Sequence, residues 1–132
     1  MKPEIAELWA TELESGRHEQ TKEVLNDGTG KCCLGVLCEL AIQAGVPIGV
    51  YEVWHEFRDG SASMVKAYDT ESTIPPMEVL KWAGFQLERN LNQANGTFTY
   101  DTGARANLAF LNANGMTFTE IAAVIRKYHG SI

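Results

Sequence analysis

Apolar residues are most concentrated between residues 31 and 45, where the chain contains KCCLGVLCELAIQAG. They recur at spacings of three and four, as on one face of a helix, and the opposite side of that helix is also mostly apolar. A helix that is apolar nearly all round is typical of a buried position. Gly45 can end such a helix in a left-handed conformation, and Pro47 prevents its continuation. We therefore predict a central core helix over residues 33–44, against which the rest of the chain packs.

The chain begins with a second helical pattern, which starts at Pro3 and ends at Gly16. The stripe that this amphipathic helix should bury consists of Ile5, Leu8, Trp9 and Leu13. A shorter helix is predicted after the proline pair at 75 and 76, and Gly84 should end it.

Two more helices are predicted near the end of the chain. The first runs from about Ala104 to Asn112. The second has Thr117 as its N-cap and Glu120 as the capping-box partner, with Met116 and Ile121 placed as a hydrophobic staple. Its inner face is expected to consist of Ile121, Val124, Ile125 and Tyr128.

Residues 50–57 and 62–68 are rich in strand-forming residues, and Asp59-Gly60 between them favours a β-hairpin. Because the alternation is imperfect, a helix over 50–57 remains an open alternative. A short edge strand is predicted at residues 97–100. The fold class predicted for the single domain 1–132 is therefore α+β, mainly helical around the central helix, with a small hairpin and a short edge strand.

The net charge of −6 disfavours nonspecific attraction to nucleic acid or to an anionic membrane. No apolar run reaches the roughly 18 residues of a membrane span, and the first residues lack a signal-peptide core. The three cysteines lie between residues 32 and 38, which fits a reducing compartment better than a disulfide framework. We therefore expect a cytoplasmic protein, and the sequence leaves self-association into a homo-oligomer open.

The block CCLGVLC at residues 32–38 is the most distinctive motif of the chain. Other blocks accompany it: Trp9, Leu13, Ser15-Gly16 and Gln20, then Ile74-Pro75, Val79 and Trp82-Ala83-Gly84, then Leu108, Leu111-Asn112, Gly115-Met116, Phe118 and Glu120-Ile121-Ala122. This order resembles a family of small proteins encoded by tailed phages and prophages, over nearly the whole chain. The resemblance implies a phage accessory protein acting in the cytoplasm of the bacterial host, and it implies no catalytic residue.

The cysteines are the first candidates for chemistry. Their spacing does not match a zinc motif, so neither a metal nor a cofactor is expected, and burial as small apolar side chains is the favoured interpretation. An alternative is a cysteine-dependent enzyme in which Cys32, at a helix N-terminus, has a lowered pKa and acts as nucleophile.

The loop from Gly28 to Cys32 partly matches a phosphate-binding motif, but it lacks the first glycine and the hydroxyl residue. The backbone amides at the helix N-terminus, together with Lys31, could still bind a small anion. A pocket there would have Arg17, Gln20 and Lys31 as its polar wall and Trp9 and Trp54 as its aromatic floor.

Glu39 lies within the core helix and is expected to reach the surface or to pair with a cation such as Arg17 or Lys31. The two predicted C-terminal helices also resemble a helix-turn-helix, but a basic recognition surface is missing. The favoured function is a noncatalytic accessory protein that binds a host component. That component is either a host protein, with inhibition of a defence system as one role, or a small anionic ligand such as a nucleotide. The alternatives are the Cys32 enzyme and a DNA-binding regulator.

Overall fold

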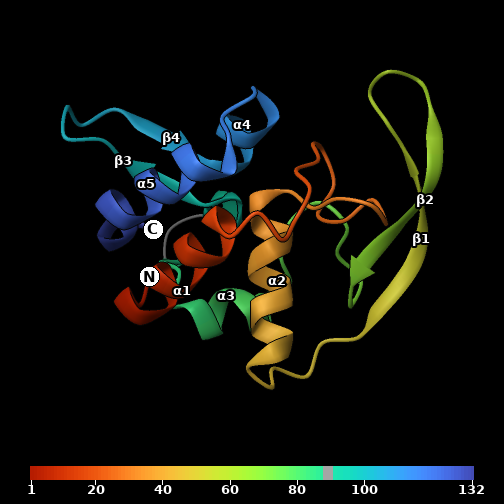
Figure 1. Ribbon diagram of the computed structural model, residues 1–132, viewed down its shortest axis with the longest axis horizontal. Coiled ribbons are helices and arrows are strands. Elements are labelled where there is room, and N and C mark those ends of the chain that lie inside the picture. Colours follow the sequence, from red (N-terminus) through yellow and green to blue (C-terminus); the bar gives the residue numbers. More distant parts are fainter. Residues whose placement is uncertain (88–90) are drawn as a thin grey trace.

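The structure is a computed structural model that describes residues 1–87 and 91–132. Within these residues, five α-helices and two antiparallel two-stranded sheets confirm the α+β fold class. The helices are α1 (Pro3–Glu14), α2 (Cys33–Gln43), α3 (Met77–Ala83), α4 (Leu108–Ala113) and α5 (Phe118–Tyr128). The strands are β1 (Val50–Glu56), β2 (Ala62–Tyr68), β3 (Thr97–Thr99) and β4 (Arg105–Asn107), and the short 3-10 helices are η1 (Leu91–Asn95) and η2 (His129–Ser131). In Figure 1 the β1–β2 hairpin stands on one side of α2, and the other helices and the β3–β4 sheet gather on the opposite side.

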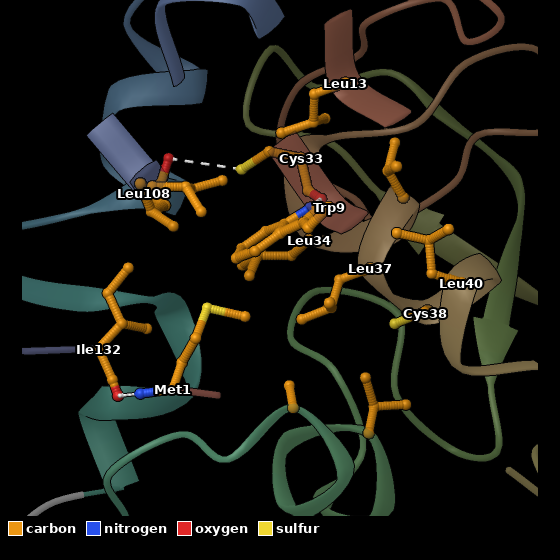
Figure 2. Close-up of a cluster of buried hydrophobic side chains, with 14 of the residues drawn as sticks. Met1, Trp9, Leu13, Cys33, Leu34, Leu37, Cys38, Leu40, Leu108 and Ile132 are labelled. Carbon is orange, nitrogen blue, oxygen red and sulfur yellow. Dashed lines mark hydrogen bonds between the residues drawn. The ribbon is translucent and has the colours of Figure 1, made fainter. Parts of the chain in front are cut away.

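The predicted core helix is confirmed as α2, which is buried on nearly all sides. Its buried side chains meet those of α1 and of the C-terminal segments in one hydrophobic cluster (Figure 2). Gly45 follows the helix with a positive φ of 94°, as its sequence position predicted. No helix among the described residues is both long enough and apolar enough to cross a membrane.

Gly35, the glycine of the CCLGVLC motif, lies where the preceding loop crosses α2. A Cβ atom at this position would lie 1.9 Å from the carbonyl oxygen of Leu25, and Leu25 is completely buried. The same carbonyl accepts a hydrogen bond of 3.2 Å from the backbone N–H of Cys32. Because no side chain fits in this space, glycine is required for the loop to pack directly on the helix.

Helix α1 begins at Pro3 as predicted and packs along α5. Trp9 is fully buried, and its indole Nε1–H donates to the carbonyl oxygen of Cys33 over 2.9 Å. The predicted stripe is wrong at Leu8, which is 45% exposed, because the core face of α1 is completed by Ala6 and Ala10 instead. Small side chains on this face are compatible with a close approach of the neighbouring helices.

The helix predicted over residues 104–112 begins later than expected. Residues 105–107 form β4, which pairs in antiparallel register with β3, so that Thr97 lies opposite Asn107. The side-chain oxygen of Asn107 accepts from the backbone N–H of Phe110 over 2.7 Å and therefore starts α4 as an N-cap. Strand pairing and this cap override the helical preference of the Ala-Arg-Ala sequence before it. Between α3 and β3 the chain forms η1, and residues 88–90 lie outside the described residues.

The last helix, α5, has the capping box predicted from Thr117 and Glu120, with both reciprocal hydrogen bonds present. Its buried face includes Ile121 and Ile125, as expected. On its outer side Arg126 pairs with Glu7 over 3.0 Å and also with Glu14, so two carboxylates of α1 hold the end of α5.

Asn112 is a polar side chain at the centre of the fold, with only 1% of its surface exposed. Its side-chain oxygen accepts from the backbone N–H of Cys33 (3.1 Å) and from the amide of Gln20 (3.0 Å), and its amide donates to the carbonyl oxygen of Thr21 (2.8 Å). One residue of α4 thus satisfies a donor at the N-terminus of α2 and fixes the loop between α1 and α2.

Candidate interaction surface on the hairpin

The predicted hairpin is confirmed, and its two strands pair over their full length, from Val50 opposite Tyr68 to Glu56 opposite Ala62. The turn closes through a hydrogen bond of 2.8 Å from the backbone N–H of Phe57 to the carbonyl oxygen of Ser61. Gly60 has a φ of 89° in this turn, which explains the Asp-Gly signal in the sequence. The helical alternative for residues 50–57 is therefore wrong.

The hairpin is attached to the helical part of the molecule at its root. The hydroxyl of Tyr68 donates to Oε1 of Glu39 in α2 over 2.6 Å and accepts from the amide of Asn26 over 3.0 Å. The backbone N–H of Lys66 donates to the carbonyl oxygen of Asn26 over 2.9 Å. Burial and the hydrogen bond to Glu39 raise the pKa of Tyr68 well above its usual range. Glu39 is partly exposed and has a phenol as its partner. Of the two predicted alternatives, reaching the surface agrees with the structure and pairing with a cation does not.

A further contact fixes one side of the hairpin. The imidazole Nε2 of His55 lies 2.9 Å from Oε2 of Glu23, whose other oxygen accepts from the backbone N–H of Arg58 over 3.1 Å. Hydrogen bonding to His55 is the main cause that lowers the pKa of Glu23. The hairpin is thus held both at its root and near its turn.

Because side chains alternate along a strand, the hairpin has two different faces. Val65 and Ala67 are 1% and 0% exposed and belong to the face that is buried against the rest of the molecule. The opposite face carries large exposed apolar side chains, and we call it the outward face. It consists of Val50, Glu52, Trp54, Met64 and Lys66, together with Tyr68, which lies opposite Val50 and is buried at the root. Tyr51 is 59% exposed but lies on the other face, opposite Ala67.

Trp54 and Met64 lie directly opposite each other in the strand register, and they are 63% and 48% exposed. Val50, which lies four residues nearer the root on the same face, is 43% exposed. Between them the carboxylate of Glu52 lies 3.9 Å from the ammonium group of Lys66. The outward face therefore combines an indole and a thioether with one opposite-charge pair, a composition suited to binding another protein.

Three of the five residues predicted to form a pocket lie in the loop region after α1. Gln20 and Lys31 are brought together by a parallel β-bridge. The amide of Gln20, however, donates to Asn112 and to the carbonyl oxygen of Met116 (2.8 Å), so it serves the internal structure. Arg17 is largely exposed and pairs with Glu12.

The other two predicted pocket residues lie in different environments. Trp9 has no exposed surface and cannot form the floor of an open pocket. Trp54 is the most exposed large apolar residue of the hairpin. Sequence reasoning selected Trp54 as an aromatic residue but missed its neighbours Met64 and Val50. Their shared face could have been inferred by extending the hairpin register outward from the Asp59-Gly60 turn.

The loop before α2 already contains an anion of its own. One carboxylate oxygen of Asp27 accepts from the backbone N–H groups of Thr29 (2.8 Å) and Gly30 (2.6 Å), and the other accepts from the hydroxyl of Thr21 (2.7 Å). Burial opposes ionisation, but these hydrogen bonds, led by that from Gly30, lower the pKa of Asp27. The loop amides of Thr29 and Gly30 therefore bind Asp27, and at the N-terminus of α2 the amide of Cys33 binds Asn112.

All three cysteines are free and buried, as predicted. Burial raises the pKa of Cys32 to about 11, although this residue lies at the N-terminus of α2, and raises the pKa values of Cys33 and Cys38 well above the usual value. The expectation of a lowered pKa at Cys32 is therefore wrong. Figure 2 shows Cys33 directed toward α4, where its thiol contacts the carbonyl oxygen of Leu108 at 3.8 Å. Among residues 1–87 and 91–132, no group of three or more His, Cys, Asp and Glu side chains could hold a metal ion.

A polar cavity of about 610 Å³ lies on the far side of the molecule from the hairpin, next to η2 and the β3–β4 sheet. Its polar lining includes Gln86, Gln93, Thr99, Arg105 and Ser131. The side-chain oxygen of Gln93 is buried there and has no hydrogen-bond partner among the residues that the structure describes. A small ligand would thus meet one guanidinium group and several amide and hydroxyl groups.

Comparison with known proteins gives a family without an assigned activity. The search of curated proteins and the search of solved structures each gave no match. A family model described as a domain of unknown function (DUF8296) matches residues 1–129, which include the core helix, the hairpin and α5. Since this match covers nearly the whole chain, the protein belongs to the DUF8296 family.

Proposed function

We propose that this protein is a noncatalytic binding protein that holds another protein against the outward face of its hairpin. The observation that carries the proposal is the pair of Trp54 and Met64, which are 63% and 48% exposed on adjacent strands. Exposing both side chains to water is unfavourable, and Trp is among the residues that contribute most to protein–protein binding. The attachment through Tyr68 and Asn26 pre-orders the hairpin, which reduces the entropy lost on binding.

The noncatalytic character rests on the state of the candidate reactive groups. The thiol of Cys32 is buried and its pKa is raised to about 11, so little nucleophilic thiolate forms near neutral pH. The loop amides before α2 are occupied by the carboxylate of Asp27. Neither group is therefore available for catalysis in this conformation.

A DNA-binding regulator is less well supported. In α5, Arg126 pairs with Glu7 and Glu14, and Lys127 lies 3.1 Å from Asp101. Basic side chains that are neutralised by neighbouring carboxylates are poorly placed to contact phosphates. A protein partner in the bacterial cytoplasm, where the three free thiols would stay reduced, agrees better with these features. Origin in a phage, and inhibition of a host defence as the purpose of binding, remain predictions from the sequence.

A small anionic ligand is the second candidate, and the polar cavity lined by Arg105 favours it. Arg105 would bind a phosphate or carboxylate, and the buried side-chain oxygen of Gln93 would accept a hydrogen bond from the ligand. Titration with ATP, cyclic dinucleotides and inorganic phosphate, followed by calorimetry, tests this function. Heat of binding that is present in the wild type and absent in Arg105→Gln supports this function. Heat of binding that is the same in both proteins contradicts it.

The main proposal is tested with the purified protein as bait in a lysate of host bacteria. Proteins retained by the wild type are identified, produced separately and measured in a direct binding assay. Trp54→Ser should weaken binding at least tenfold, because truncation of a central Trp commonly costs more than about 1.4 kcal/mol. Phe110→Ser is the matched control, since Phe110 is exposed to a similar degree (59%) but lies on α4.

Two results would contradict the proposal. One is that both variants, Trp54→Ser and Phe110→Ser, bind the partner as tightly as the wild-type protein does, because binding would then not involve the hairpin. The other is the recovery of no direct partner at native abundance.

A further inference from the structure

Strand β1 has an open edge. Within the described residues, β1 pairs with β2 alone, whereas β2 also contacts Asn26 on its other side. The edge strand contains VYEVWHE, with neither lysine nor proline, the residues that commonly prevent such edges from pairing with other chains. Among the described residues, no strand competes with a further strand for this edge of β1.

The hydrogen bonds already present show which residues of β1 face this edge. The backbone N–H of Lys66 points away from β1, because it donates to Asn26. Its register partner Glu52 must therefore direct its own N–H and C=O away from β2, since opposite residues in an antiparallel ladder share this orientation. The hydrogen bond from the backbone N–H of Phe57 to the carbonyl oxygen of Ser61 leads to the same assignment, because it shows that the odd-numbered residues of β1 form the hydrogen bonds to β2. The free backbone groups belong to Val50, Glu52, Trp54 and Glu56.

A second copy of β1 fits this edge in one register. Antiparallel pairing requires even-numbered residues to oppose even-numbered residues, so that the free groups of both copies meet. Centring the pair on Glu52 places two Glu52 carboxylates opposite each other, and centring it on Trp54 places Glu52 opposite Glu56 twice. Both arrangements bring like charges together, which destabilises a strand pair. Centring it on Val53 avoids this and pairs the whole strand.

In the register centred on Val53, each charged side chain lies opposite an uncharged one. Glu52 lies opposite Trp54 of the second copy, and Glu56 lies opposite Val50. Tyr51 lies opposite His55, which allows contact between the two rings. Each contact occurs twice, as in the two-fold symmetric dimers that are the commonest oligomers.

We propose that the protein forms a two-fold dimer in which the β1 strands of two copies pair in antiparallel fashion about Val53. The product is a continuous four-stranded sheet in the order β2, β1, β1, β2. Both outward faces lie on the same side of this sheet, so two Trp54 side chains are presented together. The dimer uses the backbone edge of β1 and the proposed partner uses the outward face, so either proposal can fail without the other.

Two charged substitutions of Trp54 test the proposed dimer, because Glu and Lys at this position should have opposite effects on dimer formation. Sedimentation of the full chain should give twice the monomer mass of 14.6 kDa for the wild type. Trp54→Glu places the new carboxylate opposite Glu52 at two points and should give a monomer, with at least a tenfold higher dissociation constant. Trp54→Lys places an ammonium group opposite Glu52 and should keep the dimer. The triple change Trp54→Glu, Glu52→Lys and Lys66→Glu keeps opposite charges at positions 52 and 66 and should restore the dimer.

A wild-type protein that stays monomeric up to millimolar concentration would overturn the dimer. A Trp54→Glu variant that stays dimeric would also overturn it, because the interface would then lie elsewhere. Loss of the dimer in both Trp54→Lys and Trp54→Glu would overturn it as well. Hydrogen exchange adds an independent measurement. The backbone N–H groups of Glu52 and Trp54 should exchange with solvent more slowly in a concentrated protein solution than in a dilute one. Trp54→Lys also separates the two proposals, because it should remain dimeric and yet lose the partner protein.

Discussion

The hydroxyl of Tyr68 donates to the carboxylate of Glu39 over 2.6 Å and joins the root of the hairpin to the core helix. Tyr68→Phe removes this donor from the half-buried Glu39 and also removes the acceptor for the buried amide of Asn26. Leaving such groups unpaired costs about 1–3 kcal/mol, so the variant should unfold at lower urea concentration than the wild type. Tyr51→Phe is the control, because Tyr51 is 59% exposed, and its stability should stay unchanged.

The same contact predicts a change at alkaline pH. The pKa of Tyr68 is raised by burial and by Glu39, so the folded state keeps a proton that the unfolded state releases near its ordinary pKa of about 10. The stabilisation is fully present below that pKa and is lost as the pH rises above it. Urea unfolding at pH 9 and pH 11 should show a smaller decrease in stability for Tyr68→Phe than for the wild type. An equal decrease would contradict this assignment.

Gly35→Ala should destabilise the fold strongly. The added methyl group would lie 1.9 Å from the carbonyl oxygen of Leu25, so either the loop or α2 must move. Overpacking of a rigid core costs roughly 3 kcal/mol. Gly130→Ala is the matched control, because nothing lies within 4 Å of its added methyl group. Equal urea midpoints for the two variants would refute the tight contact.

The thiols should react slowly in the folded protein. Raising the pKa of Cys32 from 9.0 to about 11 reduces the thiolate fraction at pH 8 about a hundredfold, and burial restricts access further. Labelling with a chromogenic disulfide should therefore be at least about a hundredfold slower in buffer than in 6 M guanidinium. Rapid labelling of Cys32 in the native state, located by peptide mass spectrometry, would support the cysteine-enzyme alternative instead.

Glu12 should contribute to stability only above acidic pH. Hydrogen bonds from Arg17, and then from His18, lower its pKa from 4.5, so the folded state loses its proton more readily than the unfolded state. The contribution is present above pH 4.5 and is lost as the pH falls below that value. Between about pH 5 and pH 3, Glu12→Gln should therefore lose less stability than the wild type does. Glu19→Gln, an exposed change in the adjoining loop, should follow the wild-type curve.

The capping box of α5 gives a prediction for a single hydroxyl. Thr117→Ala removes the acceptor for the backbone N–H of Glu120 and should lower stability by about 1 kcal/mol. Thr119→Ala, an exposed change two residues later in the same helix, should leave stability within about 0.5 kcal/mol of the wild type. If both variants unfold at the wild-type temperature, the cap does not stabilise the helix.

The sequence was sufficient where short-range chemistry decides the structure. The apolar run of α2, the Thr117 and Glu120 cap and the Asp59-Gly60 turn all act over a few residues, and each is present in the structure. The start of α4 was misplaced because pairing with β3, and not local propensity, determines the conformation of residues 105–107.

The contacts missed from the sequence join distant parts of the chain. Glu39 and Tyr68 are 29 residues apart, and Asn112 and Cys33 are 79 residues apart. No local pattern identifies such partners, because many polar residues could satisfy the same buried group. The outward face was missed in part for a different reason, since Met64 is found beside Trp54 only when the strand register is extended outward from the Asp59-Gly60 turn.

Asn112 bonds at once to the first turn of α2 and to the loop between α1 and α2, which contacts the hairpin through Asn26. Breaking these bonds would remove the partner of the Cys33 backbone N–H in α2 and the partner of the Thr21 carbonyl oxygen in the loop, so opening of one segment is coupled to opening of the other. The N-terminal turn of α2 and residues 20–21 should therefore share one opening equilibrium, and the amide of Cys33 should exchange with solvent only when α4 detaches. Movement of the hairpin root would in this way be coupled to the opposite end of the chain.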